Sequence, residues 1–153
     1  MDFLKSYEIN LNTLALIPIN EKKTKIVEKD DEFVVDNAIG KIMEESCEFF
    51  GSSLVGRQKG TSKLIGITHK APIIIEETKE IIFFPTSSPR LSSCCWISLN
   101  NLENYYPKNK KVILEFKNQK RLNLNLSYGI VDNQILRATR LESVIRKRKT
   151  KNL

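Results

Sequence analysis

The stretch CEFFGSSLVGRQKGT, from Cys47 to Thr61, decides how this chain is organised. It holds three of the six glycines and leads into a window, residues 49–75, with four basic side chains and neither Asp nor Glu. Small residues let another molecule approach the backbone closely, and unopposed positive charge favours an anion as that molecule. The plainer interpretation is a helix end, a glycine turn and a second short helix with a solvated basic face.

Two helices are expected around this stretch. Apolar residues recur at three- and four-residue spacing across residues 38–50, which is typical of an amphipathic helix. Asp36 or Asn37 can cap its start, and Gly51 stands where its end needs a left-handed residue. Either of the two serines that follow can cap a second helix reaching about residue 62, in the order of a helix-turn-helix. The residues of this second helix expected to face the core are Leu54, Val55 and Gln58.

The rest of the chain is mostly short apolar segments bounded by turn residues, which predict strands. They lie at residues 6–10, 13–19, 25–28, 33–35, 73–75, 81–84 and 95–99. Residues 112–116 and 122–126 alternate apolar and polar side chains and predict a hairpin. The Pro- and Ser-rich segment 85–93 predicts an exposed loop.

A basic helix is expected from about Asp132 to the end of the chain. Its apolar stripe consists of Ile135, Leu136, Leu141, Val144 and Ile145. We therefore predict an α+β fold, with a largely antiparallel sheet, two central helices and a C-terminal helix. The length of 153 residues and the lack of an evident linker predict a single domain over residues 1–153.

Charge is distributed unevenly along the chain. Residues 1–50 carry 6 basic and 11 acidic side chains, whereas residues 106–136 carry 6 and 2, and residues 137–153 carry 7 and 1. Together with the acid-free window, this segregation indicates a polyanionic partner more strongly than the net charge of +7 does. No apolar run approaches the length of a membrane span, and we expect no signal peptide. An odd number of cysteines, two of them adjacent, suits a reducing cytoplasm.

Patterns of catalytic and metal sites are weak. The segment Gly51–Gln58 resembles a phosphate-binding loop, but Arg57 replaces its Lys, Gln58 replaces its hydroxyl residue, and a helix precedes it. A serine nucleophile would need the single histidine, His69, and no spacing indicates that pair. The three cysteines include no CxxC pair. We therefore expect no enzyme activity, no metal and no cofactor.

Four ordered motifs carry a family resemblance. They are CEFFGSSLVGRQKGT at residues 47–61, THKAPI at residues 68–73, FFPT at residues 83–86 and CWIS at residues 95–98. With SYEIN at residues 6–10 and VEKD at residues 27–30, they resemble ComK, the competence transcription factor family of low-GC Gram-positive bacteria. The resemblance runs from about Ser6 to about Leu141, and four motifs in one register are more specific than a lone glycine pattern.

The resemblance implies a sequence-specific DNA-binding activator of DNA-uptake genes. Members of the family bind AT-rich boxes through the minor groove, as dimers that pair on paired boxes, and longer members continue well past the region of Leu141 with a segment used in adaptor-dependent turnover. We therefore expect double-stranded DNA, a second copy of the chain, RNA polymerase and a proteolytic adaptor as partners, with no membrane. The expected localisation is cytoplasmic and nucleoid-associated.

Arginine suits a narrow, electronegative minor groove because its guanidinium is more weakly hydrated than an ammonium group. Arg57 is placed first, because glycines beside it permit close approach, and the lysines are expected to neutralise phosphates. The residues expected to contact DNA are Ser52, Ser53, Arg57, Lys59, Thr61, Lys63, Lys70, Arg90, Arg137 and Arg140. Two other classes of function stay open: a basic RNA- or protein-binding module, and an enzyme acting on a phosphorylated small molecule at residues 51–60.

Overall fold

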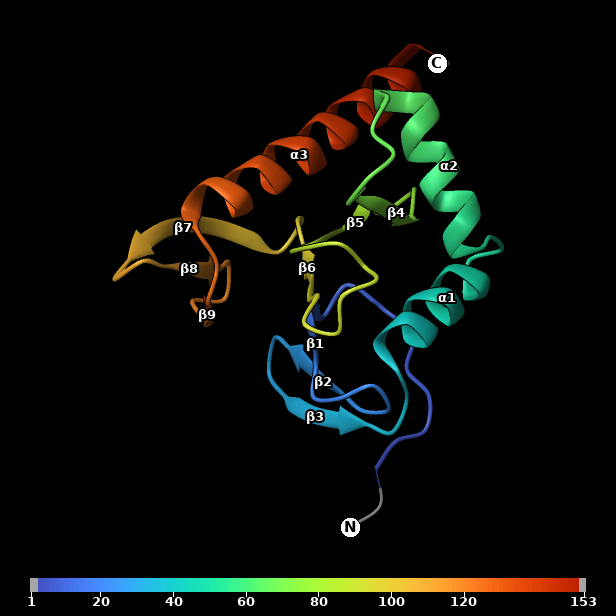
Figure 1. The fold of residues 1–153 in the computed structure, drawn as a ribbon. Helices are drawn as coiled ribbons and strands as arrows, with labels where there is room; N and C mark the ends of the chain where they lie inside the picture. The colour runs from blue at the N-terminus through green and yellow to red at the C-terminus, as the bar shows by residue number, and fades with distance from the viewer. Residues whose placement is uncertain (1–2, 152–153) are drawn as a thin grey trace.

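The computed structural model describes residues 3–151, and it is built from two antiparallel sheets and three helices (Figure 1). The larger sheet has the order β3-β2-β1-β6-β5-β4 and the smaller one the order β7-β8-β9. The α+β prediction is confirmed, although the strands form two sheets and not one. The strands are β1 Thr13–Pro18, β2 Thr24–Glu28, β3 Glu32–Val35, β4 Ile73–Glu76, β5 Ile81–Pro85, β6 Trp96–Ser98, β7 Leu102–Lys108, β8 Lys111–Phe116 and β9 Arg121–Leu124. The helices are α1 Ile39–Phe49, α2 Leu54–Ile65 and α3 Tyr128–Lys151.

The larger sheet separates two hydrophobic cores. Alternation along β5 places Phe83 in the core beneath α1 and Phe84 in the core shared with α3 and the smaller sheet. Every residue of β5 is buried, because both faces of this strand are covered. Strands β1–β3 and strands β4–β6 join where β1 pairs with β6, and β1 pairs with β2 on its other side.

The local structure predicted around residues 47–61 is largely confirmed. Gly51 is left-handed, with φ at +84°, and the Ser53 hydroxyl accepts a hydrogen bond from the Gly56 amide at 2.9 Å. The expected cap of α1 is wrong, since its N-cap residue is Ala38, without a side-chain cap. The second helix continues to Ile65, because a left-handed glycine that ends it lies only at the next position.

Two residues expected in the core are exposed instead. Val55 is 56% exposed and Leu136 is 57% exposed, so neither belongs to the buried stripe of its helix. The buried face of α3 passes through Val131, Ile135 and Leu141. This helix begins four residues earlier than expected, since the Ser127 hydroxyl accepts a hydrogen bond from an amide of its first turn.

The predicted strand at residues 6–10 is wrong, because that segment is irregular although Tyr7 and Ile9 are buried. Side chains provide its polar partners: the Tyr7 hydroxyl bonds to Thr13, and the Ile9 amide donates to the Ser46 hydroxyl. Strand β7 was not expected from the sequence. That strand is mostly exposed and contains a proline, and both properties are typical of a sheet edge.

Candidate nucleic-acid interface

Helix α2 and two loops, at residues 68–71 and 88–90, form one depression on the surface. Its volume is about 460 Å³, and we call it the basic pocket. It is lined by Gln58, Thr68, His69, Lys70, Ala71, Ser88, Pro89 and Arg90. The structure thus brings together Lys70 and Arg90, two residues predicted to contact DNA from different parts of the chain.

Helix α3 holds the two loops of the basic pocket in place. Gln134 is 1% exposed, and its Nε2 donates to the carbonyls of Lys70 at 2.8 Å and Pro85 at 2.7 Å. One turn later, Arg137 Nη1 donates to the His69 carbonyl at 3.0 Å. A third predicted residue, Arg137, therefore lies at this pocket, and one turn further on Arg140 is exposed on the same helix.

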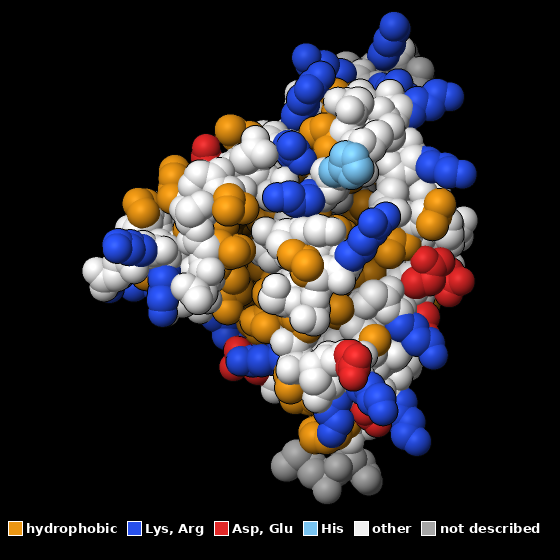
Figure 2. Space-filling view, in the orientation of Figure 1, with side chains coloured by type: hydrophobic (Ala, Val, Ile, Leu, Met, Phe, Trp, Pro, Cys, Tyr) orange, Lys and Arg blue, Asp and Glu red, His pale blue; other side chains and the backbone are white. Residues whose placement is uncertain are grey.

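The electrostatics of this region are strongly one-sided. The segments that form it, residues 49–75, 81–102 and 133–141, contain neither Asp nor Glu. In Figure 2 the histidine side chain lies among Lys and Arg side chains, and no acidic side chain lies between them. A surface with this charge raises the local concentration of anions and attracts a polyanion over several ångströms.

Arg57, the residue placed first by the sequence, lies elsewhere. It lines a second depression of about 200 Å³ with Gly56, Gly60 and Arg148, on a different face of α2 from Gln58. Its side chain is half-buried, and its Nε has no hydrogen-bond partner among the described residues. The glycines do leave space beside Arg57, but that space is also lined by Ile145 and Arg148 of α3 and by Glu77.

The remaining predicted residues of α2 differ in exposure. Lys59 and Lys63 are exposed one turn apart, so both are free to meet phosphates. Thr61 is fully buried, and its hydroxyl donates to the Pro72 carbonyl at 2.6 Å, so this residue is a core hydrogen-bond donor and does not reach the surface. Ser53 caps the helix, and its neighbour Ser52 lines the second depression.

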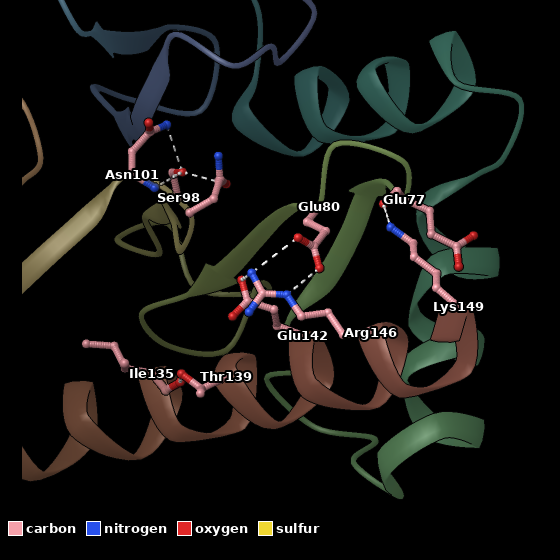
Figure 3. A network of polar contacts seen from close by, with 10 residues as sticks. Glu77, Glu80, Ser98, Asn101, Ile135, Thr139, Glu142, Arg146 and Lys149 are labelled. Carbon is pink, nitrogen blue, oxygen red and sulfur yellow. Dashed lines mark hydrogen bonds and ion pairs between the residues drawn. The ribbon is translucent and has the colours of Figure 1, made fainter. Parts of the chain in front are cut away.

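The C-terminal half of α3 is docked and not a free basic tail. Figure 3 shows Arg146 directed at Glu80, with Nε and Nη2 at 2.7 and 3.2 Å from the two carboxylate oxygens. Lys149 Nζ donates to the Glu77 carbonyl at 2.7 Å, and Glu142 lies 3.6 Å from Arg146. The guanidinium of Arg146 holds the pKa of the Glu80 carboxyl below its ordinary value. Arg146 and Lys149, two cations of the predicted basic helix, thus make contacts within the fold.

Sequence reasoning missed several polar residues of this region, above all Gln134. Its signal was present: a polar residue interrupts the apolar face of α3 next to Ile135, and a buried polar side chain needs partners.

The glycine segment 51–58 is a helix end followed by a helix start, which is not the strand-to-helix turn of a nucleotide-binding loop.

Cysteine and histidine side chains are dispersed. Within residues 3–151, no three His, Cys, Asp or Glu side chains are placed to hold one metal ion. Burial raises the pKa of the Cys47 thiol to about 11, and that of Cys95 to about 11 as well, so neither thiol is ionised near neutrality. No helix in the described part of the chain is long and apolar enough to cross a bilayer.

Comparison with known proteins confirms the resemblance. Residues 4–150 match the family model described as ComK protein. The chain is 37% identical over 144 residues to the competence transcription factor of Bacillus subtilis (strain 168), covering 92% of this chain and 75% of that protein. No solved structure matches it. The family and this relative are those of a transcription factor and not of an enzyme. The chain belongs to the ComK family.

Proposed function

We propose that this chain is a competence transcription factor that binds AT-rich boxes in duplex DNA through the minor groove. Its similarity to the competence transcription factor of Bacillus subtilis supports the role in competence. The observation that carries the mode of binding is the convergence of Lys70, Arg90 and Arg137 on one acid-free surface. Regulation by DNA binding needs such a surface, because backbone phosphates supply most of the affinity.

We assign the groove-reading role to Arg90 in preference to Arg57. Arg90 is exposed in the loop between β5 and β6, and its side chain makes no ion pair with another described residue. A narrow A·T groove concentrates negative potential and attracts an arginine that can enter it. Arg137 and Arg140 would flank this contact, while Lys59, Lys63 and Lys70 would meet phosphates.

The first experiment measures binding to matched AT-rich and GC-rich duplexes by fluorescence anisotropy across a salt series. The proposal expects tighter binding to the AT-rich duplex and competition by a distamycin-type minor-groove ligand. Insensitivity to that ligand, combined with loss of binding after methylation of major-groove positions, would contradict the minor-groove assignment. An RNA duplex of the same sequence tests the alternative of an RNA-binding module.

Two substitutions at Arg90 separate reading from attraction. Arg90→Lys keeps the charge but loses the planar guanidinium, so it should lose AT preference while the salt dependence stays unchanged. Arg90→Gln should lose the AT preference and also flatten the slope of log K against log salt by about 0.9, because one phosphate contact is lost. Lys22→Gln, an exposed charge in the β1–β2 turn, is the matched control and should leave both quantities unchanged. Equal AT preference in Arg90→Lys and the parent would remove Arg90 from the reading role.

The family's other partners remain predictions for this chain. A dimer, or a pair of dimers on paired boxes, is tested by sedimentation of the chain alone and with a two-box duplex. Contacts with RNA polymerase and with a proteolytic adaptor are tested by pull-down with purified components. Association with the nucleoid is tested by imaging a fluorescent fusion in the cell.

A further inference from the structure

The hairpin formed by β7 and β8 projects from the body of the molecule (Figure 1). Its tip consists of Lys108, Asn109, Lys110 and Lys111, all exposed. Figure 2 shows basic side chains at the end of this projection, on the same face as the basic pocket. None of the lysines was among the residues predicted to contact DNA.

No acidic group balances this charge. Residues 104–114 contain neither Asp nor Glu, and neither does β9, the strand beside β8. Among the described residues, no ion pair or side-chain hydrogen bond engages Lys108, Lys110 or Lys111. The three ammonium groups therefore project into solvent with only one another as charged neighbours at the tip.

The placement of these lysines opposes the stability of the hairpin in two ways. Lys108 and Lys111 face each other directly across the two strands, and like charges in that position repel. The two turn residues, Asn109 and Lys110, both have positive φ, at +51° and +64°. Such a turn favours Asn followed by Gly, so lysine occupies a position where glycine would be less strained.

Protection of a sheet edge does not account for the cluster. Lysine on an edge strand discourages pairing with another chain, and β7 is an edge strand. That explanation covers Lys108 alone, because Lys110 lies in the turn and Lys111 begins the central strand β8. At this one tip, lysines occupy both a directly paired position where like charges repel and a turn position that favours glycine. Exceptions of this kind to local rules concentrate at functional sites.

We propose that the tip of the β7–β8 hairpin is a second nucleic-acid contact, which grips backbone phosphates of the duplex bound at the basic pocket. The inference rests on the proposed function, since it takes the same duplex as its partner. Lysine fits this role because its ammonium group is a compact charge on a flexible stem that meets phosphates without reading bases. The hairpin would raise affinity for any sequence and leave the AT preference to the pocket.

Two variants and one control test the contact. In Lys108→Gln/Lys111→Gln, the salt slope on AT-rich and GC-rich duplexes should flatten by about 1.8, which is two phosphate contacts. In Lys110→Gly, affinity for both duplexes should fall and the melting temperature should rise, because turn strain and a repelling charge are both removed. Lys5→Gln/Lys22→Gln removes the same charge at exposed positions near the N-terminus and should leave the slope unchanged.

The outcomes separate this inference from the proposed function. If the parent binds no duplex, both are overturned. If the parent binds AT-rich duplex but the hairpin variants bind like the control, only the proposed contact at the hairpin tip is overturned. A Lys110→Gly variant that melts lower than the parent and binds DNA with equal affinity would show that Lys110 stabilises the fold. That result would also overturn the proposed contact at the hairpin tip. Weakened binding together with raised stability is the expected combination.

Discussion

Gln134→Leu is the most informative perturbation of the interface, because Gln134 sits behind the basic pocket and touches both of its loops. The side chain is 1% exposed and donates to two carbonyls, those of Lys70 and Pro85. Leucine has a similar volume but no donor, so the variant keeps the packing of α3 and removes both hydrogen bonds. No cation is lost.

The expected cost follows from the partners left behind. Each buried carbonyl without a donor costs about 1–3 kcal/mol, so the two together cost roughly 2–6 kcal/mol. The bond to Lys70 is only partly buried, so water replaces some of that loss. Gln134 Oε1 itself has no partner among the described residues, and removing it returns about 1–3 kcal/mol. The free energy of unfolding should therefore fall by about 1–3 kcal/mol. For a chain of this size, each kcal/mol lowers the melting temperature by about 2–4 °C.

Urea unfolding and anisotropy on AT-rich duplex measure the two consequences. The midpoint should fall at an unchanged m-value, and DNA affinity should fall because the two loops lose their common anchor. The salt slope should stay at the parent's value, since every cation that we propose to bind phosphate remains. Asn133→Ala, an exposed neighbour on α3, is the control. Parental stability and parental affinity in Gln134→Leu would refute the claim that these bonds position the loops.

Three further outcomes follow from buried and paired groups. Arg146→Met removes the ion pair with Glu80 and should lower the free energy of unfolding by about 0.5–1 kcal/mol. This ion pair lowers the pKa of Glu80 in the folded state. Urea melts should therefore show the full difference above the ordinary carboxyl pKa of ~4.3 and lose it as the pH falls through the lowered pKa. Thr61→Val leaves the Pro72 carbonyl without its donor and should cost about 1–2 kcal/mol by thermal melting, with no change in the DNA affinity of the folded protein. The raised pKa of Cys47, about 11, should keep this thiol unmodified by an alkylating reagent at pH 7, as read by mass spectrometry, until urea unfolds the chain.

Local chemistry was predictable from the sequence around the glycine-rich stretch. Gly51 and Ser53 act through conformations and hydrogen bonds within a few residues of themselves, so their roles as helix end and helix cap could be predicted. The irregular segment 6–10 could not, because its partners Thr13 and Ser46 reach it only in the folded chain. Apolar alternation indicated burial there correctly, but burial does not require a strand.

The candidate site shows the same division between local and tertiary information. Basic segments are visible in the sequence, and two of them, residues 49–75 and 137–153, do meet at the basic pocket through Lys70 and Arg137. Arg90 joins them from a loop whose surroundings in the sequence are not basic. Which side chains meet is decided by tertiary packing, which places Arg57 and Arg148 in one depression and Arg90 and Lys70 in another. Adjacency to glycine predicted room around Arg57, but it could not predict what would occupy that room.

Helix α3 connects every surface that the proposals involve. Near its start, Asp132 accepts a hydrogen bond from the Tyr105 hydroxyl at 2.6 Å, and the buried Val131 shares a core with the strands of the smaller sheet. Its middle anchors the basic pocket through Gln134, and its end is tied to Glu80 in the turn between β4 and β5. The smaller sheet and the loops of the basic pocket are therefore both held against one continuous helix. A duplex that contacts both must span the distance between them, so the β7–β8 hairpin would contribute to affinity only on DNA long enough to reach it. Shortening the duplex from the hairpin side should thus abolish the effect of Lys108→Gln/Lys111→Gln while preserving that of Arg90→Lys.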